Sequence, residues 1–233
     1  MGRVMQKRLA RKLDLELLLS KIKPHPNPQP KLEQYTIPAD VAATMLYLAS
    51  NVYNDLEGKR VLDLGCGTGR LALGAAFLGA KQIVGLDLDK AAIRTAVENS
   101  KLVGLSGKVE WIVGDVDAVD DCFDTVLQNP PFGVQTRGAD RKFLKKALAV
   151  GRRVYSIHKS PRKNGISVKK LKNVSEGIVP IDASPFLKNF VEAHRGKIVA
   201  VYATVMSLPH MFGFHTKSKH EFIVDLYVLE QKH

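Results

Sequence analysis

Two patterns of apolar and polar residues alternate along most of the chain. Short, mostly apolar runs are typical of strands buried on both faces of a sheet, and they occur at residues 60–64, 82–86, 109–113, 123–128 and 154–158. Segments with the three-to-four-residue spacing of helices lie between most of them, at about residues 69–78, 89–103 and 140–150. Only a short acidic loop separates the third and fourth runs, so we expect almost no helix there. This alternation predicts an α/β fold with a mostly parallel sheet covered on both faces.

The N-terminal part of the chain has a different pattern. Leucines recur every four residues, at Leu9, Leu13 and Leu17. This spacing predicts a basic helix over residues 4–22 whose leucine stripe docks on the rest of the protein. Prolines then alternate with other residues at positions 24–30 and favour an extended connector. We therefore expect a basic helix and connector at residues 1–31, followed by one domain over residues 32–233, which starts with a helix at about 38–52.

The C-terminal part predicts one more helix and two more strands, at residues 186–194, 198–205 and 222–229. The last two strands can pair antiparallel at one edge of the sheet. Residues 160–172 are rich in Lys, Arg and Gly and indicate a mobile loop or a short basic helix. The whole pattern predicts a mostly parallel seven-stranded sheet with an antiparallel edge strand.

The net charge of +12 is unevenly distributed over the 233 residues. The net charges along the chain are +6 for residues 1–31, −4 for 32–58, −2 for 59–130, +4 for 131–149 and +8 for 150–233. An acidic middle between basic flanks suits a protein that holds a cationic ligand centrally and a polyanion around it. The alternative is that the lysine-rich faces are simply solvated.

Other features of the composition bear on the compartment. No run approaches the roughly 18 apolar residues of a membrane span, and the N-terminus lacks the clean apolar core of a signal peptide. The two cysteines fit a reducing compartment and cannot bind zinc alone. We expect a cytoplasmic protein with no membrane partner and no metal site.

A glycine-rich turn follows the first strand, in the segment Val61-Leu62-Asp63-Leu64-Gly65-Cys66-Gly67-Thr68-Gly69. Glycines let a ligand approach the backbone closely. A dinucleotide site requires G-x-G-x-x-G, and here Arg70 occupies the last position. The pattern Asp-x-Gly-x-Gly-x-Gly instead resembles the first motif of Rossmann-like class I S-adenosylmethionine-dependent methyltransferases. An acid such as Asp63 suits the positive charge of that cofactor.

Acids also follow the second and third strands, at Asp87 and Asp115. A carboxylate at Asp87 can accept hydrogen bonds from both ribose hydroxyls, and Asp115 can accept one from the adenine amine. A single acid at a strand end is more often a turn or cap residue. Three acids at the ends of successive strands predict a cofactor site.

The fourth strand ends in Asn129-Pro130-Pro131-Phe132, the predicted reaction centre. The lone pair of an aromatic amine is delocalised into its ring. Acceptors for both N–H groups, the Asn129 side-chain oxygen and the Pro130 carbonyl, favour a pyramidal nitrogen with its lone pair exposed. The two prolines keep these acceptors aimed, and Phe132 can stack on an extruded base. The alternative is a proline-rich turn without chemistry.

Four other functions fit parts of this pattern. Methylation of a glutamine amide in a translation factor uses a similar tetrad, but Phe132 and the basic flanks favour RNA. Methylation of DNA adenine shares the chemistry, although no additional target-reading domain is evident. A non-catalytic RNA-binding or assembly protein would retain the fold without turnover. A nicotinamide-dependent oxidoreductase is disfavoured by the displaced glycine.

The chain resembles the methyltransferase-like protein five family in four segments, at residues 32–35, 63–69, 129–133 and 154–160. The resemblance implies N6-methylation of an adenosine in small-subunit ribosomal RNA. It also implies a partner, a small zinc-binding methyltransferase-activator subunit beside the third strand, where Trp111 is either an anchor or a core residue. His158 and Lys159, at the end of the fifth strand, are candidate RNA contacts, with a role in capping the strand as the alternative. The residues expected to bind S-adenosylmethionine are Gln34, Tyr35, Thr36, Asp63, Gly65, Cys66, Gly67, Thr68, Gly69, Leu71, Asp87, Leu88, Asp115 and Val116.

Overall fold

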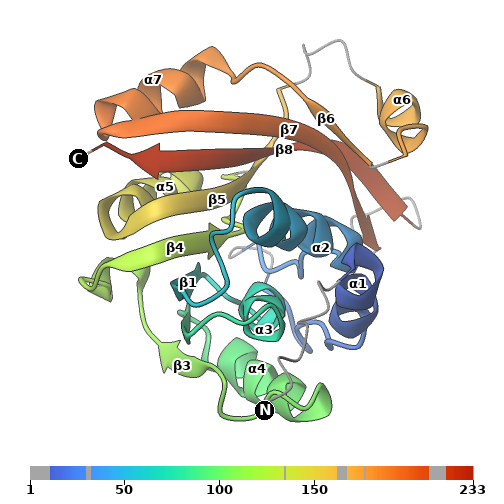
Figure 1. The fold of residues 1–233 in the computed structure, drawn as a ribbon, viewed down its shortest axis with the longest axis vertical. Helices are drawn as coiled ribbons and strands as arrows, with labels where there is room; N and C mark the ends of the chain where they lie inside the picture. Colours follow the sequence, from blue (N-terminus) through green and yellow to red (C-terminus); the bar gives the residue numbers. More distant parts are fainter. Residues whose placement is uncertain are drawn as a thin grey trace, which may run out of the picture.

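Within the described residues, a twisted sheet of eight strands runs through the protein (Figure 1). The computed structural model describes residues 11–29, 33–133, 135–161, 167–175, 177–209 and 219–232. The strands are β1 (Arg60–Leu64), β2 (Gln82–Asp87), β3 (Glu110–Val113), β4 (Phe123–Gln128), β5 (Gly151–Lys159), β6 (Ile178–Pro180), β7 (Gly196–Pro209) and β8 (Lys219–Gln231). Their order in the sheet is β3-β2-β1-β4-β5-β8-β7-β6. The first five strands pair in parallel, and β8, β7 and β6 continue the sheet with antiparallel pairs.

The prediction of an α/β fold is confirmed, and the count of seven strands is corrected to eight. The additional strand is β6, which pairs with β7 and forms the edge of the sheet beyond the predicted antiparallel pair. It has three residues and ends at Pro180, so it is too short to show a strand-like alternation in the sequence.

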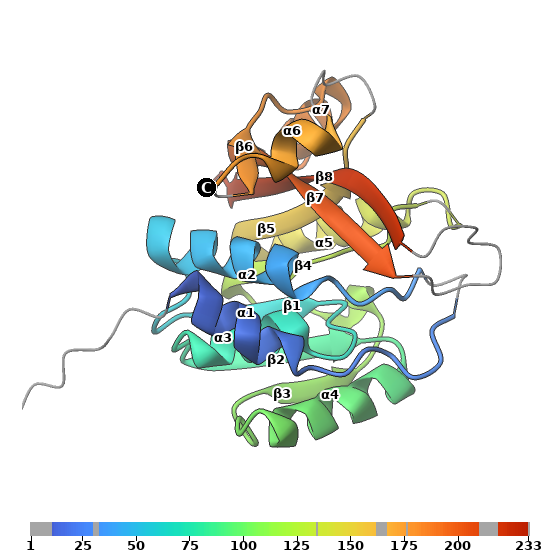
Figure 2. The same cartoon turned by 90° about the vertical axis from the view of Figure 1, so that its right-hand side faces the viewer.

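Helices cover both faces of the sheet (Figure 2). They are α1 (Lys12–Ser20), α2 (Ala39–Tyr47), α3 (Arg70–Phe77), α4 (Lys90–Leu102), α5 (Ala139–Val150), α6 (Val168–Lys172) and α7 (Pro185–Ala193). A π-helical turn, η2 (Leu48–Val52), extends α2. Between β3 and β4, where the sequence predicts almost no helix, the chain forms only a short 3-10 turn, η3 (Val116–Ala118).

Each face of the sheet has its own hydrophobic core, because successive strand residues point to opposite faces. In β1, Val61 belongs to the core beneath α1, α2 and α3, whereas Leu62 and Leu64 belong to the core beneath α5 and α7. In β3, Trp111 packs against the first of these cores. Its ring lies where side chains on Gly69 and Gly85 would stand, which favours the core role over the anchor role.

The N-terminal helix docks through a different face from the predicted one. Leu15, Leu19 and Ile22 are buried against the first core, whereas Leu13 and Leu17 are 57% and 56% exposed. Leu9 lies outside the described residues. Burial of each such aliphatic side chain stabilises the fold by about 1.5–3 kcal/mol, so α1 is firmly attached to α2 and α3.

The segment expected as a mobile loop or short basic helix, residues 160–172, contains the short helix α6. The adjoining residues 162–166 lie outside the described part of the chain. Within the described residues, every helix is too short or too polar to cross a membrane.

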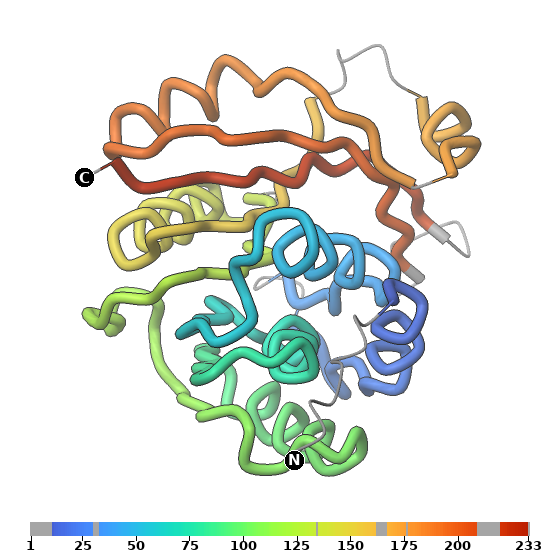
Figure 3. Tube along the Cα trace, viewed as in Figure 1, coloured from blue at the N-terminus to red at the C-terminus, as the bar shows by residue number. Residues whose placement is uncertain are grey.

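The chain reverses its direction across the sheet between β1 and β4. From β1 it proceeds to β2 and β3 on one side, and from β4 to β5 on the other, as the trace in Figure 3 shows. In an open parallel sheet, the loops after two such strands diverge and leave a crevice at their carboxyl ends. The predicted acids and the Asn-Pro-Pro-Phe tetrad all follow strands that end here.

Candidate active site

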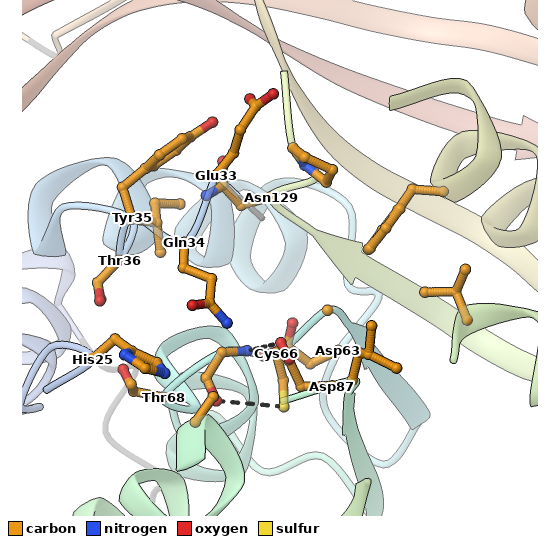
Figure 4. Close-up of a pocket in the computed structure, with 18 of the residues that line it drawn as sticks. His25, Glu33, Gln34, Tyr35, Thr36, Asp63, Cys66, Thr68, Asp87 and Asn129 are labelled. Atoms are coloured by element: carbon orange, nitrogen blue, oxygen red, sulfur yellow. Dashed lines mark hydrogen bonds between the residues drawn. The ribbon is translucent and has the colours of Figure 1, made fainter. Parts of the chain in front are cut away.

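A cavity of about 370 Å³ occupies the carboxyl ends of β1, β2 and β4. Residues 33–36 and Asn129 lie along one wall, and Thr68, Asp87 and Asp63 lie across from them (Figure 4). The cavity brings together most of the residues predicted from sequence, namely Gln34, Tyr35, Thr36, Asp63, Gly65, Cys66, Gly67, Thr68, Leu71, Asp87, Leu88, Asp115, Val116, Asn129 and Pro131. Gly69, Pro130 and Phe132 are adjacent but do not line it.

A buried carboxylate, Asp63, and a half-buried one, Asp87, give the floor of the cavity its negative charge. Asp63, which is 1% exposed, accepts a hydrogen bond from the Ala72 amide through Oδ2 at 2.8 Å. Burial, aided by the nearby charge of Asp87, raises the pKa of Asp63 from 3.8 to about 7. Burial also raises the pKa of Asp87, although that carboxylate accepts hydrogen bonds from the amides of Asp89 and Gly67. A cationic ligand would relieve the cost of these charges.

The glycines of the turn serve different purposes from one another. A side chain on Gly65 would stand 2.6 Å from the Phe143 ring, and one on Gly69 would stand 2.5 Å from Trp111. At Gly67, with φ +52°, a side chain would meet no protein atom within 4 Å. Gly67 is therefore the glycine whose backbone opens directly onto the cavity, while the other two allow neighbouring aromatic rings to pack.

The third predicted acid, Asp115, is half exposed at the start of η3. Its Oδ1 accepts hydrogen bonds from the amide of Asp117 and from Lys142 Nζ, the latter at 2.8 Å. These two contacts hold the pKa of Asp115 below its ordinary value. Lys142 comes from α5 and also pairs with Asp117 at 3.0 Å, so it fixes η3 against that helix.

The described part of residues 22–37, here called the N-terminal segment, closes the cavity opposite the glycine turn. Gln34 donates a hydrogen bond through Nε2 to Asp89 Oδ2 at 2.7 Å. His25 Nδ1 accepts from the Asn27 amide, so Nε2 carries the hydrogen and donates to the same oxygen of Asp89 at 3.1 Å. Although partial burial disfavours its charge, Asp89 has a lowered pKa because of the bonds from Gln34, Ala91 and His25. The segment is thus anchored on the first turn of α4.

The Asn-Pro-Pro-Phe tetrad lies beside the N-terminal segment, and its Asn129 and Pro131 line the cavity. The Oδ1 atom of Asn129 is buried and has no hydrogen-bond partner among the described residues. A buried acceptor without a partner is costly in a folded protein, which indicates that its partner is a ligand. Phe132 follows, with its ring 5.2 Å from that of Tyr35 and 5.9 Å from that of Phe222.

Glu33 holds the backbone of the tetrad loop. Its Oε2 accepts from the Phe132 amide at 2.7 Å, and its Oε1 accepts from the Gln135 amide at 2.8 Å. A carboxylate that accepts two amides in this way forms strong, charge-assisted hydrogen bonds. Glu33 itself has a left-handed backbone, with φ +50°.

Comparison with known proteins places the chain in a family. A family model described as the methyltransferase small domain matches residues 39–153. The chain is 40% identical to the rRNA N(6)-adenosine-methyltransferase Mettl5 of Drosophila melanogaster, over 65% of this chain and 75% of that protein. The chain belongs to the Mettl5 family of methyltransferases. The resemblance predicted from the sequence motifs is therefore confirmed.

Two archaeal relatives match almost the whole chain. An uncharacterized protein of Methanocaldococcus jannaschii, MJ0284, is 37% identical over 96% of this chain and 95% of its own. The crystal structure of PH1948 from Pyrococcus horikoshii, named as a candidate RNA methyltransferase, is 34% identical. It superposes with a TM-score of 0.80 and covers 97% of this chain and 100% of that one. The match with this crystal structure therefore extends over the C-terminal strands and α7.

Membership of the Mettl5 family makes this protein a methyltransferase, a class of enzyme whose usual methyl donor is S-adenosylmethionine. The residues of the cavity fit that molecule. S-adenosylmethionine carries a positive sulfur and an ammonium group. The buried acid Asp63 and the half-buried acid Asp87 lack a cationic partner within hydrogen-bond distance among the described residues. The Oγ1 atom of Thr68 is also buried without a partner, and Gly67 leaves room for close approach.

Several cavity residues were not predicted from sequence. They are His25, Glu33, Ile37, Arg70, Ala92, Thr136, Ala139, Lys142 and Phe143. His25 lies in the proline-rich stretch that was interpreted only as a connector. Arg70 was noted only as a departure from the dinucleotide pattern, yet its guanidinium donates to the carbonyls of Ile22 and Ile37 and so joins the two ends of the N-terminal segment. That role depends on contacts distant in sequence, which no local pattern reveals.

Proposed function

We propose that this protein methylates the N6 amine of an adenosine in RNA, most specifically in small-subunit ribosomal RNA. The observation that carries the proposal is the buried Oδ1 of Asn129, which has no hydrogen-bond partner among the described residues and stands beside a cavity with one buried acid, Asp63, and one half-buried acid, Asp87. An acceptor that is preorganised for an N–H group stands next to a site suited to a cationic methyl donor. Catalysis of this kind depends mainly on positioning and on fixed dipoles.

The chain's own residues have three tasks in this reaction. Asn129 Oδ1 and the Pro130 carbonyl accept the two N–H groups of the amine, and the two prolines keep the loop from donating competing hydrogen bonds. Glu33 fixes the loop through the amides of Phe132 and Gln135. When bound, S-adenosylmethionine supplies a methyl group on a positively charged sulfur. The methylated amine then loses one proton to water, so no strong general base is required.

The cofactor is held by the remaining cavity residues in this proposal. Asp63 faces the positively charged end, Asp87 accepts from the ribose hydroxyls, and Asp115 accepts from the adenine amine. The segment Gln34–Thr36 closes over the site opposite them. The catalytic unit comprises residues 32–233, with residues 1–31 as its N-terminal extension.

RNA as the substrate is supported by charge and by the relatives. Residues 131–233 carry a large excess of Lys and Arg, which suits phosphate contacts. The Mettl5 proteins of Drosophila melanogaster and Danio rerio are both named rRNA N(6)-adenosine-methyltransferases. We also propose that the enzyme acts in the cytoplasm, because its two cysteines, Cys66 and Cys122, are free and fit a reducing compartment.

The test is transfer of a tritiated methyl group from S-adenosylmethionine to separated RNA, DNA and protein fractions, followed by mapping of the labelled nucleotide. We expect label in RNA, as N6-methyladenosine in the small-subunit rRNA. Asn129→Ala should abolish transfer while S-adenosylmethionine affinity stays within about threefold, a change of less than about 0.7 kcal/mol. Asn51→Ala, at an exposed asparagine of η2, is the matched control and should keep wild-type activity. Label in a glutamine side chain of a protein, or unchanged turnover by Asn129→Ala, would refute the proposal.

We also propose that a small zinc-binding activator subunit adds beside β3. This strand forms one edge of the sheet, and its residues Ile112 and Val113 are 37% and 49% exposed. An open strand edge flanked by exposed apolar side chains suits pairing with another strand. Val113→Lys should weaken co-elution of the two subunits in size-exclusion chromatography, whereas Val199→Lys, at another partly exposed strand valine, should not. Equal co-elution of both variants would contradict this interface.

A further inference from the structure

A second cavity, of about 790 Å³, adjoins the reaction centre on the side away from the cofactor cavity. We call it the α7 groove. Its lining includes Phe132, Asp140, His158, Lys159, Asp182 and Phe186. Pro131 and Ala139 line the cofactor cavity, whereas Phe132 and Asp140, the next residues along the chain, line the α7 groove. The tetrad and the first turn of α5 therefore form the partition between the two spaces. The volume lies within the roughly 300–1,000 Å³ of small-ligand sites.

Phe186 is the most exposed aromatic side chain of this groove. It lies in the first turn of α7 and is 57% exposed, although its neighbours Leu187 and Val191 are buried in the core. Its ring stacks on that of Phe190, one turn later, at 6.4 Å between centroids. Phe190 in turn stacks on His194 at 4.2 Å. The ring is thus supported from one side and contributes little to the core, which is the arrangement of a stacking platform for a base.

The lining of the groove also includes an oriented histidine, His158. Gln128 Nε2 donates to Ser156 Oγ at 2.9 Å, and Ser156 Oγ lies 2.8 Å from His158 Nε2. All three side chains are buried, so the Ser156 hydroxyl hydrogen is satisfied by donating to Nε2. Nδ1 then carries the ring hydrogen, which makes His158 a neutral donor suited to a base edge. Burial lowers the pKa of His158 to about 4, which keeps the ring neutral at physiological pH.

The charges around the groove indicate how a nucleotide would be oriented. Lys159 is an exposed cation beside His158 in the lining of the groove. Asp140 and Asp182 would repel a phosphate but accept hydrogen bonds from a base amine. The base would therefore point into the groove, with its phosphates outward near Lys159.

We propose that the α7 groove binds the base of an RNA nucleotide adjacent to the target adenosine, stacked on Phe186 and hydrogen-bonded by His158. Such a site requires single-stranded RNA at the target, because a paired base cannot enter a groove of this kind. This inference rests on the proposed methylation of RNA, and it adds a specificity-determining contact outside the tetrad. The shared wall of the two cavities, formed by the tetrad and the first turn of α5, places the flanking base next to the reaction centre.

A cycle that combines protein variants with RNA variants tests this inference. The probe is a fluorescein-labelled oligouridylate with one central adenosine, alone or with an abasic nucleotide beside the adenosine or at the end of the strand. Affinity is measured by fluorescence anisotropy. Stacking is worth roughly 1–3 kcal/mol per base, so Phe186→Ala should weaken binding about tenfold, and Phe186→Trp should restore it. Phe77→Ala, at a partly exposed phenylalanine of α3, should have no effect.

The decisive result is the coupling between the two kinds of change. In the wild type, an abasic site beside the adenosine should weaken RNA binding about tenfold. In Phe186→Ala the same abasic site should weaken RNA binding less than about twofold, because the aromatic ring on which the base would stack is already missing. Equal losses in both proteins, or unchanged RNA affinity of Phe186→Ala, would overturn the inference, as expected if α7 contacts a protein instead. Failure of the wild type to methylate any RNA fraction would refute the proposed function itself, which is a distinguishable outcome.

Discussion

Replacement of Asp63 by asparagine should stabilise the unliganded protein at alkaline pH and weaken its binding of S-adenosylmethionine. Asp63 is 1% exposed, and its main protein contact is the hydrogen bond from the Ala72 amide at 2.8 Å. Asparagine can keep that bond through its own side-chain oxygen. What it removes is a buried charge close to Asp87.

The size and sign of the effect follow from the pKa. Burial and the Asp87 charge raise the pKa of Asp63 from 3.8 to about 7. The folded protein therefore retains a proton in a pH range where the unfolded chain has released it. Stability from this group is fully present below pH 3.8 and is lost as the pH rises to about 7. At about 1.4 kcal/mol per pH unit, the loss above pH 7 has an upper bound of about 4 kcal/mol.

Urea unfolding of the unliganded protein at pH 5 and pH 8 measures this difference. The gain in unfolding free energy of Asp63→Asn over the wild type should be larger at pH 8 than at pH 5, by about 1–3 kcal/mol. Asp120→Asn, at an exposed aspartate, should show no such pH dependence. Calorimetry should show weaker cofactor binding by Asp63→Asn at pH 8, and a wild-type affinity that declines below pH 7. If Asp63→Asn is destabilised equally at both pH values, the charge of Asp63 is not the source of strain and the reasoning fails.

Two further substitutions test the N-terminal segment and the glycine turn. Glu33→Gln weakens the charge-assisted bonds to the Phe132 and Gln135 amides, so turnover should fall about tenfold, or about 1.4 kcal/mol, with cofactor affinity nearly unchanged. Single-turnover methyl transfer and calorimetry measure the two effects, and an equal loss in both would assign Glu33 to the cofactor instead. Gly69→Ala adds a side chain 2.5 Å from Trp111 at φ +87° and should cost about 2–4 kcal/mol of unfolding free energy. Gly104→Ala, at φ +72° with open space, should cost only about 1 kcal/mol. Equal unfolding midpoints in urea for these two glycine variants would contradict the packing argument.

The main domain was predictable because its parallel strands are short apolar runs that end in chemically distinctive residues. Asp63, Asp87 and Asn129 each follow such a run, and the rule that carboxyl ends of parallel strands share one edge was enough to bring them together. The strand β6 was missed because three residues carry no periodic signal. The periodicity of apolar residues predicts an element best where that element is long and buried. It predicts least for short strands at the edge of the sheet.

The face of α1 could not be chosen from sequence for a related reason. Leucines occupy positions 13, 15, 17, 18 and 19, so a stripe every four residues can be drawn along more than one side of the helix. Packing against α2 and α3 selects Leu15 and Leu19. His25 and Glu33 escaped prediction because their partners are 64 and 99 or more residues away in the chain. Such contacts are set by the tertiary structure alone.

The N-terminal segment connects the two halves of the site. His25 and Gln34 hold Asp89, two residues after Asp87, while the adjacent Glu33 holds the loop that presents Asn129. Movement of this segment would disturb the cofactor wall and the acceptor loop together, because the same backbone carries both sets of contacts. The unliganded site carries a buried acid, Asp63, and an acceptor, Asn129 Oδ1, without a partner among the described residues, and both cost stability. A cation bound in the cavity relieves part of that cost and should hold the N-terminal segment more firmly in place. We therefore expect cofactor binding to favour the arrangement of Asn129 that receives the base.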